Sequence, residues 1–172
     1  HLSIGQEAIP VGVSSRLTIS DQIVSAHRSH AHYLAKGCDL KKMISELFGK
    51  VDGCCRGKGG SMHLFDLEAG QIAAVPIVGS SIPIGTGVAL GLKRQKKPGI
   101  VVIYLGEGAT EEGVFSESLD FAKLQNLPVL FVCENNQYSV YTPLGPRQDS
   151  KRSIINIAKA HGIPAVSGDG ND

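Results

Sequence analysis

The sequence predicts an α/β protein in which helices flank a parallel β-sheet. Two short apolar runs rich in β-branched residues, at 100–105 and 129–133, have the composition of buried strands. Between them, residues 112–125 carry apolar side chains at the spacing of an amphipathic helix. A strand, a helix and a second strand in this order predict a βαβ unit with parallel strands. We expect both strands to be buried on both faces.

Five further helices are predicted outside this unit, at residues 5–16, 29–35, 39–49, 83–95 and 153–161. In the third of them, Asp39 is placed to cap the N-terminus and Gly49 to end the helix. We expect its apolar face to consist of Leu40, Met43, Ile44, Leu47 and Phe48. Residues 50–82 are glycine-rich and are predicted to be irregular, and so long a loop in a compact domain is commonly functional. Because no internal linker is evident, residues 1–172 are assigned to a single domain.

Composition excludes some classes of partner. The 17 basic and 16 acidic residues nearly cancel, so neither a nucleic-acid surface nor a membrane surface is expected. The sequence has no run of 18 apolar residues, which predicts no membrane span, and no secretory signal is evident. Its four cysteines form no C-x-x-C pair. These features favour a reduced cytoplasmic setting, or a mitochondrial matrix in a eukaryote.

Polar residues follow both strands of the predicted βαβ unit. Glu107 lies between Gly106 and Gly108 directly after the first strand, and Asn135 and Asn136 follow the second. Parallel strands end at the same edge of a sheet, where open α/β sheets bind their ligands. A carboxylate and an amide oxygen suit a Mg²⁺ ion that also holds a phosphate group, and the glycines let the backbone approach that phosphate. An ordinary exposed turn carboxylate is the alternative reading of Glu107.

The same residues carry a family resemblance. A Gly-Glu-Gly tip followed some thirty residues later by Asn-Asn resembles the thiamine diphosphate motif. The longer strings at 106–113 and 133–138 resemble the alpha subunit of thiamine-dependent 2-oxo-acid dehydrogenases, the decarboxylating component of the pyruvate, branched-chain and acetoin complexes. Further matches, in the family's order, lie at 1–8, 28–30, 57–63 and 77–79. Because family alpha subunits are longer at both ends, we expect this chain to be the cofactor-binding core of a larger subunit.

The resemblance implies a thiamine diphosphate-binding fold with Mg²⁺ bound to the diphosphate. The side chains of Glu107 and Asn136 and the backbone carbonyl of Tyr138 would ligate the metal. Arg28 would contact the diphosphate, to which a guanidinium fork is suited. The cofactor would also lie against the tip residues Gly106, Glu107, Gly108 and Ala109.

Two more roles follow from the resemblance alone. His30 would be the catalytic histidine, hydrogen-bonding charge that develops in the reaction. Val78 would offer its backbone carbonyl to the aminopyrimidine of the cofactor. The chain departs from the family at His27, where many relatives have tyrosine, and at Pro76, where pyruvate-type members often have glycine. Branched-chain relatives also carry glutamate at the position of Glu107.

The activity implied is oxidative decarboxylation of a pyruvate-like 2-oxo acid, with acyl transfer to a lipoyl-bearing acyltransferase. The glutamate that activates the pyrimidine comes from the beta subunit in heterotetrameric relatives, so we expect an alpha–beta partnership. An acetoin-type or other thiamine-dependent C–C cleaving enzyme and a non-catalytic thiamine-binding protein stay open. A nicotinamide-binding domain is a more distant alternative, because Gly85-Thr86-Gly87 and Gly91 form an imperfect G-x-G-x-x-G.

Several polar residues have plainer interpretations. His27, His30 and His32 could suggest zinc, but no cysteine or carboxylate is spaced to complete a site. His63 is expected to anchor the glycine-rich loop, and Asn135 to shape the turn after its strand.

Overall fold

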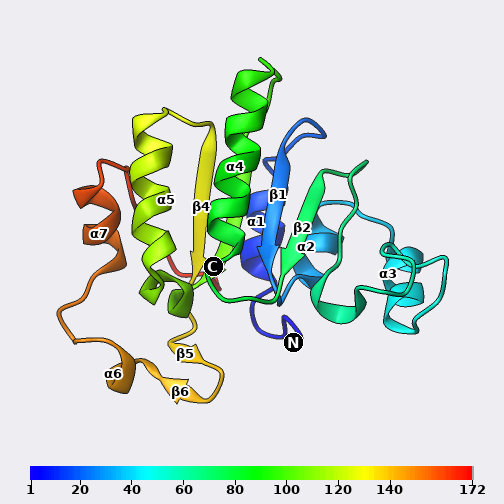
Figure 1. Cartoon of the computed structure of the whole chain (residues 1–172). Helices are drawn as coiled ribbons and strands as arrows, with labels where there is room; N and C mark the ends of the chain where they lie inside the picture. Colours follow the sequence, from blue (N-terminus) through cyan, green and yellow to red (C-terminus); the bar gives the residue numbers. More distant parts are fainter. Residues whose placement is uncertain (172) are drawn as a thin grey trace.

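Four parallel strands form the central sheet of the computed structural model, which describes residues 1–171 (Figure 1). The sheet order is β2-β1-β3-β4, with β1 at Gln22–Ala26, β2 at Gln71–Val75, β3 at Val101–Gly106 and β4 at Val129–Glu134. All three neighbouring pairs are parallel. The predicted fold class, an α/β protein with a parallel sheet flanked by helices, is confirmed.

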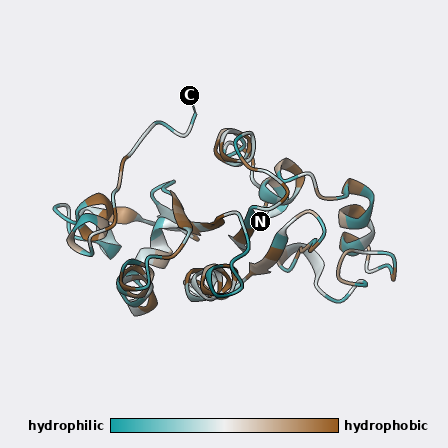
Figure 2. Cartoon of the chain, turned by 90° about the horizontal axis from the view of Figure 1, so that it is seen from above, coloured by the Kyte–Doolittle hydropathy of each residue, from teal (hydrophilic) through white to brown (hydrophobic). Residues whose placement is uncertain are grey.

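Helices cover both faces of the sheet. On one face α4 (Ser81–Arg94) and α5 (Gly113–Leu124) bury the main apolar core, and on the other α1 (Ala8–Ser14) packs against β1 and β3 (Figures 1 and 2). The remaining helices are α2 (His30–Ala35), α3 (Leu40–Leu47), α6 (Leu144–Arg147) and α7 (Ile154–Ala160), with 3₁₀ turns η1 (Gly60–Met62) and η2 (Glu107–Glu111). Strands β5 (Tyr138–Ser139) and β6 (Thr142–Pro143) form a small hairpin. None of the helices within residues 1–171 is long and apolar enough to cross a membrane.

The predicted βαβ unit is present as β3, α5 and β4. Its two strands pair in register from Val101 opposite Val129 to Gly106 opposite Glu134. The expectation that both strands are buried is confirmed for β3 and wrong for β4. Leu130 of β4 is 44% exposed, because β4 lies at the edge of the sheet rather than inside it.

The sequence analysis missed two of the four strands. Nothing there predicted β1, and β2 lies in the segment 50–82 that was expected to be irregular. Each is only five residues long, and both begin with glutamine. Such short runs, with small or polar residues among the apolar ones, give a weak strand signal by themselves. They become strands by pairing within the sheet: β1 pairs with β3, and β2 pairs with β1.

Helix α3 is capped as predicted but packs differently. The Asp39 carboxylate accepts hydrogen bonds from the backbone amides of Lys41 and Lys42, at 2.7 and 3.1 Å, and Gly49 takes a left-handed φ of +65° after the helix. Of the five residues expected on its apolar face, only Met43 is buried. The other buried side chain of α3 is the carboxylate of Glu46, which the pattern did not predict.

The glycines that suggested a nicotinamide site have another purpose. Gly85 and Gly87 lie inside α4, not in the turn between a strand and a helix that a dinucleotide fingerprint requires. A Cβ atom on Gly85 would come within 2.4 Å of Ile103 Cγ1, so glycine there lets α4 approach β3 closely. This placement argues against the nicotinamide alternative.

Candidate functional site at the carboxyl edge of the sheet

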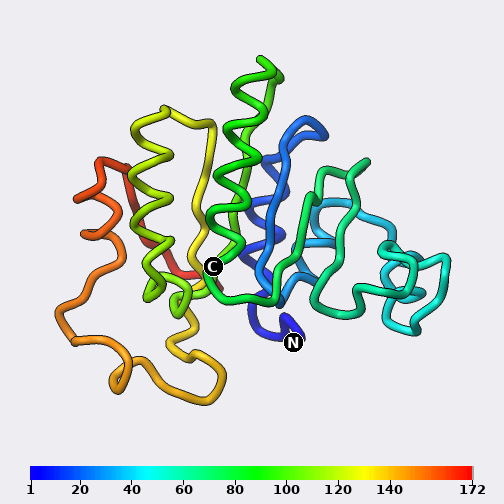
Figure 3. The backbone as a smooth tube through the Cα atoms, in the orientation of Figure 1, coloured from blue at the N-terminus to red at the C-terminus, as the bar shows by residue number. Residues whose placement is uncertain are grey.

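Every predicted site residue ends or follows one of the four parallel strands. Arg28 and His30 follow β1, Val78 follows β2, Glu107 follows β3, and Asn136 follows β4. Because the strands are parallel, these four loops meet at one edge of the sheet, the lower edge in the view of Figure 3. The structure thus gathers at the ligand-binding edge of an α/β sheet residues that are up to 108 positions apart (136 − 28).

Glu107 is not an ordinary exposed turn residue. It opens η2 directly after β3 and is 2% exposed. Its Oε1 atom accepts a hydrogen bond from Nη2 of Arg147 at 2.5 Å, while the other terminal nitrogen of Arg147 is bonded to Glu111. A buried carboxylate requires a cationic partner or several hydrogen-bond donors, and here a guanidinium is that partner. The position in front of Glu107 therefore accommodates positive charge.

Two asparagine side chains stabilise turns in the loop after β4. Asn135 Oδ1 accepts from the amide of Gln137 at 3.0 Å, and Asn136 Oδ1 accepts from the amide of Tyr138 at 2.9 Å. The prediction that Asn135 shapes the turn is confirmed, and Asn136 has a similar local bond. An amide oxygen has two lone pairs, so this bond leaves Asn136 Oδ1 one acceptor site for a ligand. Tyr138, the first residue of β5, is exposed.

The loop after β1 is fastened by the N-terminal segment and by the glycine-rich loop. Arg28 Nη1 donates to the carbonyl of Leu2 at 2.5 Å. The His30 ring reaches the His1 carbonyl through Nδ1 and the Ser61 hydroxyl through Nε2, both at 3.1 Å. Two segments that the sequence separates by about sixty residues thus hold the predicted catalytic imidazole in one orientation.

Burial lowers the pKa of His30, and the Arg28 guanidinium lowers it further. The same two influences lower the pKa of His27, whose ring lies edge-on to that of His1 at 4.7 Å. Near neutral pH both imidazoles are therefore neutral, and a neutral imidazole can donate at one nitrogen and accept at the other.

The backbone at Val78 is open to a ligand. The carbonyls on either side of it, those of Ile77 and Gly79, accept from the amides of Ser80 and Ile82. Within residues 1–171 no donor is bonded to the Val78 carbonyl. Gly79 has a φ of +85°, which favours glycine, and turns the chain directly into α4.

Two features at this edge had no signal in the sequence. Arg147 lies forty positions from Glu107, and its neighbour Arg152 donates to the Thr110 carbonyl at 2.6 Å, which fastens the segment after β6 over η2. A buried pair joins His32 Nε2 to Glu134 Oε1 at 3.2 Å, with the His32 ring stacked on Tyr104. This pair ties α2 to the end of β4.

The three histidines considered for zinc do not converge. His27 packs against His1, His30 bonds to Ser61, and His32 bonds to Glu134. Among residues 1–171, the group with metal-ligand spacing is instead Glu46, Cys54 and Cys55.

Glu46 organises the glycine-rich loop, a role that sequence reasoning also missed. Its Oε2 atom accepts from the amides of Cys55 and Gly57, both at 2.8 Å, and its Oε1 atom from those of Gly59 and Gly60, at 2.7 and 2.9 Å. Burial alone would raise the pKa of this carboxyl, but the four amides hold it below its ordinary value. His63 Nδ1 is bonded to the Gly59 carbonyl at 2.8 Å, which confirms that His63 anchors this loop.

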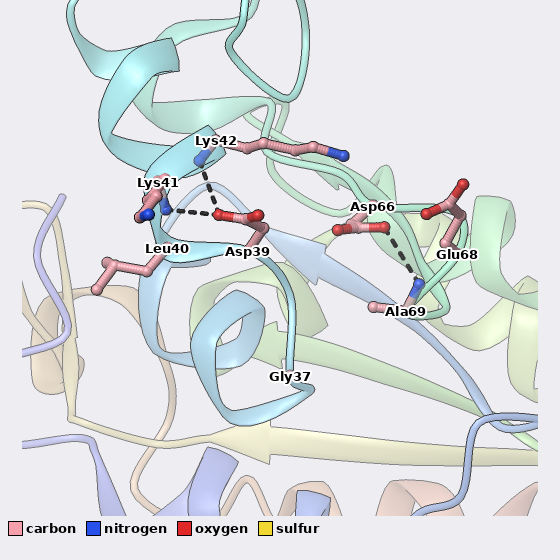
Figure 4. A pocket seen from close by; sticks show the side chains of 8 residues that line it. All are labelled: Gly37, Asp39, Leu40, Lys41, Lys42, Asp66, Glu68 and Ala69. Carbon is pink, nitrogen blue, oxygen red and sulfur yellow. Dashed lines mark hydrogen bonds between the residues drawn. The ribbon is translucent and has the colours of Figure 1, made fainter.

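One surface hollow lies away from the carboxyl edge. A hollow of about 650 Å³ lies between the start of α3 and the turn before β2, lined by charged side chains (Figure 4). Asp39 there caps α3, and Asp66 Oδ1 accepts from the Ala69 amide at 3.1 Å. Both carboxylates thus have local structural partners.

The fold and this edge define an α/β domain in which polar loops gather at the carboxyl ends of parallel strands. A family model described as "Dehydrogenase E1 component" matches residues 1–172, so the chain belongs to that family. It is 45% identical to the alpha subunit of acetoin:2,6-dichlorophenolindophenol oxidoreductase of Bacillus subtilis, over the whole chain and 51% of that protein. It is 40% identical to the chloroplastic pyruvate dehydrogenase E1 component subunit alpha-3 of Arabidopsis thaliana, covering 41% of that protein.

The chain spans about half the length of the curated relatives it matches. Its fold is also similar to that of a solved structure from Mycobacterium smegmatis described as a candidate thiamin diphosphate-dependent enzyme. The TM-score is 0.57 at 16% identity, covering 94% of this chain and 27% of that one. This likeness supports the fold.

Proposed function

We propose that this chain is the cofactor-binding core of a dehydrogenase E1 alpha subunit that holds thiamine diphosphate and Mg²⁺ at the carboxyl edge. The observation that carries the proposal is the convergence of four loops there, with the buried carboxylate of Glu107 facing a cationic group. The names of the relatives, alpha subunits of acetoin and pyruvate enzymes, agree with it.

The residues present fit a metal-bound diphosphate. Glu107 and Asn136 offer hard oxygen atoms of the kind Mg²⁺ prefers, and the Tyr138 carbonyl would be the third protein ligand. A Cβ atom on Gly106 would meet no atom within 4 Å, so there is open space beside the tip for a phosphate. Arg28, with its remaining guanidinium donors, would bind the diphosphate oxygens.

The cofactor, when bound, supplies a carbanion and an electron sink for cleavage next to a carbonyl. The chain's own residues would bind the cofactor and orient it and the substrate. The Val78 carbonyl would accept a hydrogen bond from the aminopyrimidine, since nothing within residues 1–171 donates to it. His30 Nδ1 donates to the His1 carbonyl, so Nε2 of the neutral ring is an acceptor and would donate to charge that develops on the substrate only after taking up a proton.

We propose oxidative decarboxylation of a pyruvate-like 2-oxo acid, with acyl transfer to a lipoyl-bearing acyltransferase. A beta subunit would complete the site, because no glutamate of this chain matches the family's pyrimidine-activating position. A second candidate is an acetoin-cleaving enzyme. It is favoured by the 45% and 43% identity to the acetoin oxidoreductase alpha subunits of Bacillus subtilis and Cupriavidus necator.

The test is to express the full alpha subunit with its beta partner and to measure thiamine diphosphate binding by calorimetry, with and without Mg²⁺. We expect tight binding only with Mg²⁺, and none of NAD under the same conditions. Turnover of pyruvate, branched 2-oxo acids and acetoin then distinguishes the two candidate activities. Binding of NAD in place of thiamine diphosphate would refute the proposed function.

A further inference from the structure

Cys54 and Cys55, next to each other in the glycine-rich loop, point their thiols the same way. Their Sγ atoms are 3.8 Å apart, and both residues are half-buried. The loop is preorganised, because Glu46 holds the backbone amides of Cys55 and Gly59 within it and the Cys55 thiol donates to the His63 carbonyl at 2.8 Å. Glycine at 59 is required for this packing, since a Cβ atom there would lie 3.0 Å from Cys55 Sγ.

A cavity adjoins Cys55, one residue of this pair. It measures about 380 Å³ and is lined by Cys55, Lys58, Gly59 and His63 on the loop side and by Phe65, Ile72, Ala73 and Ala74 on the other. Its wall next to β2 is therefore apolar. A ligand bonded to both sulfurs could place an apolar substituent of a few carbon atoms in this cavity.

The two thiols could form a disulfide, bind a metal ion or bind another thiophilic group, and the geometry distinguishes these possibilities. A disulfide between adjacent residues is strained, because consecutive Cα atoms are about 3.8 Å apart, whereas ordinary disulfides span about 4.4–6.8 Å. A zinc ion, with Zn–S bonds of about 2.3 Å, could bridge the two sulfurs, but zinc sites use three or four protein ligands. Glu46, whose carboxylate oxygen lies within 4.8 Å of both sulfurs, has about four acceptor sites. Four backbone amides take up those sites.

What remains is a centre that needs only two thiols and carries an organic group. We propose that Cys54 and Cys55 form a binding site for a monosubstituted trivalent arsenical, R–As(OH)₂, with the R group in the cavity beside β2. Two As–S bonds form and two As–O bonds break. The thiol protons leave with the hydroxyl groups as two molecules of water, arsenic stays trivalent, and no oxidant is needed. Burial, and then the neighbouring Cys54 thiol, raise the pKa of Cys55 to about 12, so the protonated Cys55 thiol assumed here is the form present at neutral pH.

A short series of hydrogen bonds connects this site to the carboxyl edge. The amides of Gly59 and Gly60 are bonded to Glu46, and the next residue, Ser61, is bonded to Nε2 of His30 at 3.1 Å. An arsenical on the loop would therefore act close to the proposed catalytic histidine without binding the cofactor's own ligands.

The experiment uses the full alpha subunit with its beta partner and without the lipoyl-bearing component, whose dithiol would take up the reagent. Phenylarsine oxide is added at one equivalent, unbound reagent is removed by gel filtration, and the alpha chain is digested with trypsin. Cleavage after Lys50 and Arg56 releases residues 51–56, which contain Cys54 and Cys55 and no other cysteine. We expect one phenylarsenic group on this peptide, removed by a dithiol such as 2,3-dimercaptopropanol but not by a monothiol at the same thiol concentration.

Variants give an independent readout. Cys54→Ser and Cys55→Ser should each abolish the retention of the reagent that resists a monothiol, whereas Cys38→Ser and Cys133→Ser should retain it in full. Retention in both of the first two variants, or the arsenic on a different peptide of the wild-type chain, would overturn the proposal. So would loss in Cys38→Ser with retention in Cys55→Ser, because the pair would then be Cys38 and Cys54, which pack in the same small core. The peptide result needs no variant, so it stands even if a serine variant fails to fold.

Discussion

Glu46 and Glu107 are both buried carboxylates, at 1% and 2% exposure, yet their surroundings differ in kind. Glu46 is surrounded by four backbone amides of the glycine-rich loop, the first of them only nine residues further along the chain. Glu107 is instead paired with one side-chain cation, Arg147, from a segment forty residues away. Amides of a fixed loop cannot leave, but a flexible guanidinium can be exchanged for another cation. A buried carboxylate is therefore a candidate ligand only when its partner can be replaced.

The largest effect is expected at Glu46. Glu46→Ala leaves four amides without their acceptor, and each unsatisfied buried group costs about 1–3 kcal/mol. Because water can reach part of the loop, we expect a loss of about 3 kcal/mol in the free energy of unfolding, measured by urea denaturation of the full alpha subunit. Glu117→Ala, on the exposed side of α5, is the control and should change it by less than about 0.5 kcal/mol. A loss below about 1 kcal/mol at Glu46 would contradict its structural role.

In contrast to Glu46→Ala, Glu107→Ala should have little effect on the free energy of unfolding and a large effect on cofactor binding. Loss of an outer-sphere partner typically weakens metal affinity by about 10–100-fold, so loss of a direct ligand should weaken Mg²⁺-dependent thiamine diphosphate binding by at least about 100-fold. Glu111→Ala is the matched control, because Glu111 shares Arg147 but is not a proposed ligand. Calorimetric titration measures both. Unchanged affinity in Glu107→Ala would remove the metal assignment.

A glycine beside each carboxylate, Gly53 beside Glu46 and Gly106 beside Glu107, allows the same distinction between stability and binding to be tested. A Cβ atom on Gly53 would lie 2.4 Å from Glu46 Oε2 and 2.6 Å from its Cα, so Gly53→Ala should destabilise the protein by about 1–3 kcal/mol through overpacking. A Cβ atom on Gly106 would meet nothing within 4 Å. Gly106→Ala should therefore keep wild-type stability in denaturation and lose cofactor affinity. Equal destabilisation of both variants would mean that the space beside Gly106 is not reserved for a ligand.

The smallest effect concerns pH. The pKa of Glu46 in the folded state is lowered, so its contribution to stability is fully present above the unfolded value of about 4.3. That contribution is lost as the pH falls through the folded pKa, when the carboxyl takes up a proton. Unfolding free energies of the wild type, measured from pH 7 to pH 3, should therefore fall more steeply in this acid range than those of Glu46→Gln. Parallel curves for the two proteins would contradict the assignment.

Much of the site could be predicted from the sequence because its signals are local. The run 100–105, the helix after it and the run 129–133 fix a βαβ unit, and parallel strands place their polar tips at one edge. Asp39 is recognisable as a helix cap from the positions next to it. Each of these features depends on residues a few positions apart, where periodicity and capping chemistry act.

The tertiary structure decided the features that depend on distant partners. Strands β1 and β2 become strands only by pairing within the sheet, and β4 is half-exposed because no strand of the described chain lies on its outer side. Arg147 reaches Glu107, and His32 reaches Glu134 across 102 positions, with no periodic signal in between. The sequence by itself determined which polar residues end the strands of the βαβ unit. Only the folded chain determined which of them are buried and what faces them, because burial and ion pairing depend on how segments pack in three dimensions.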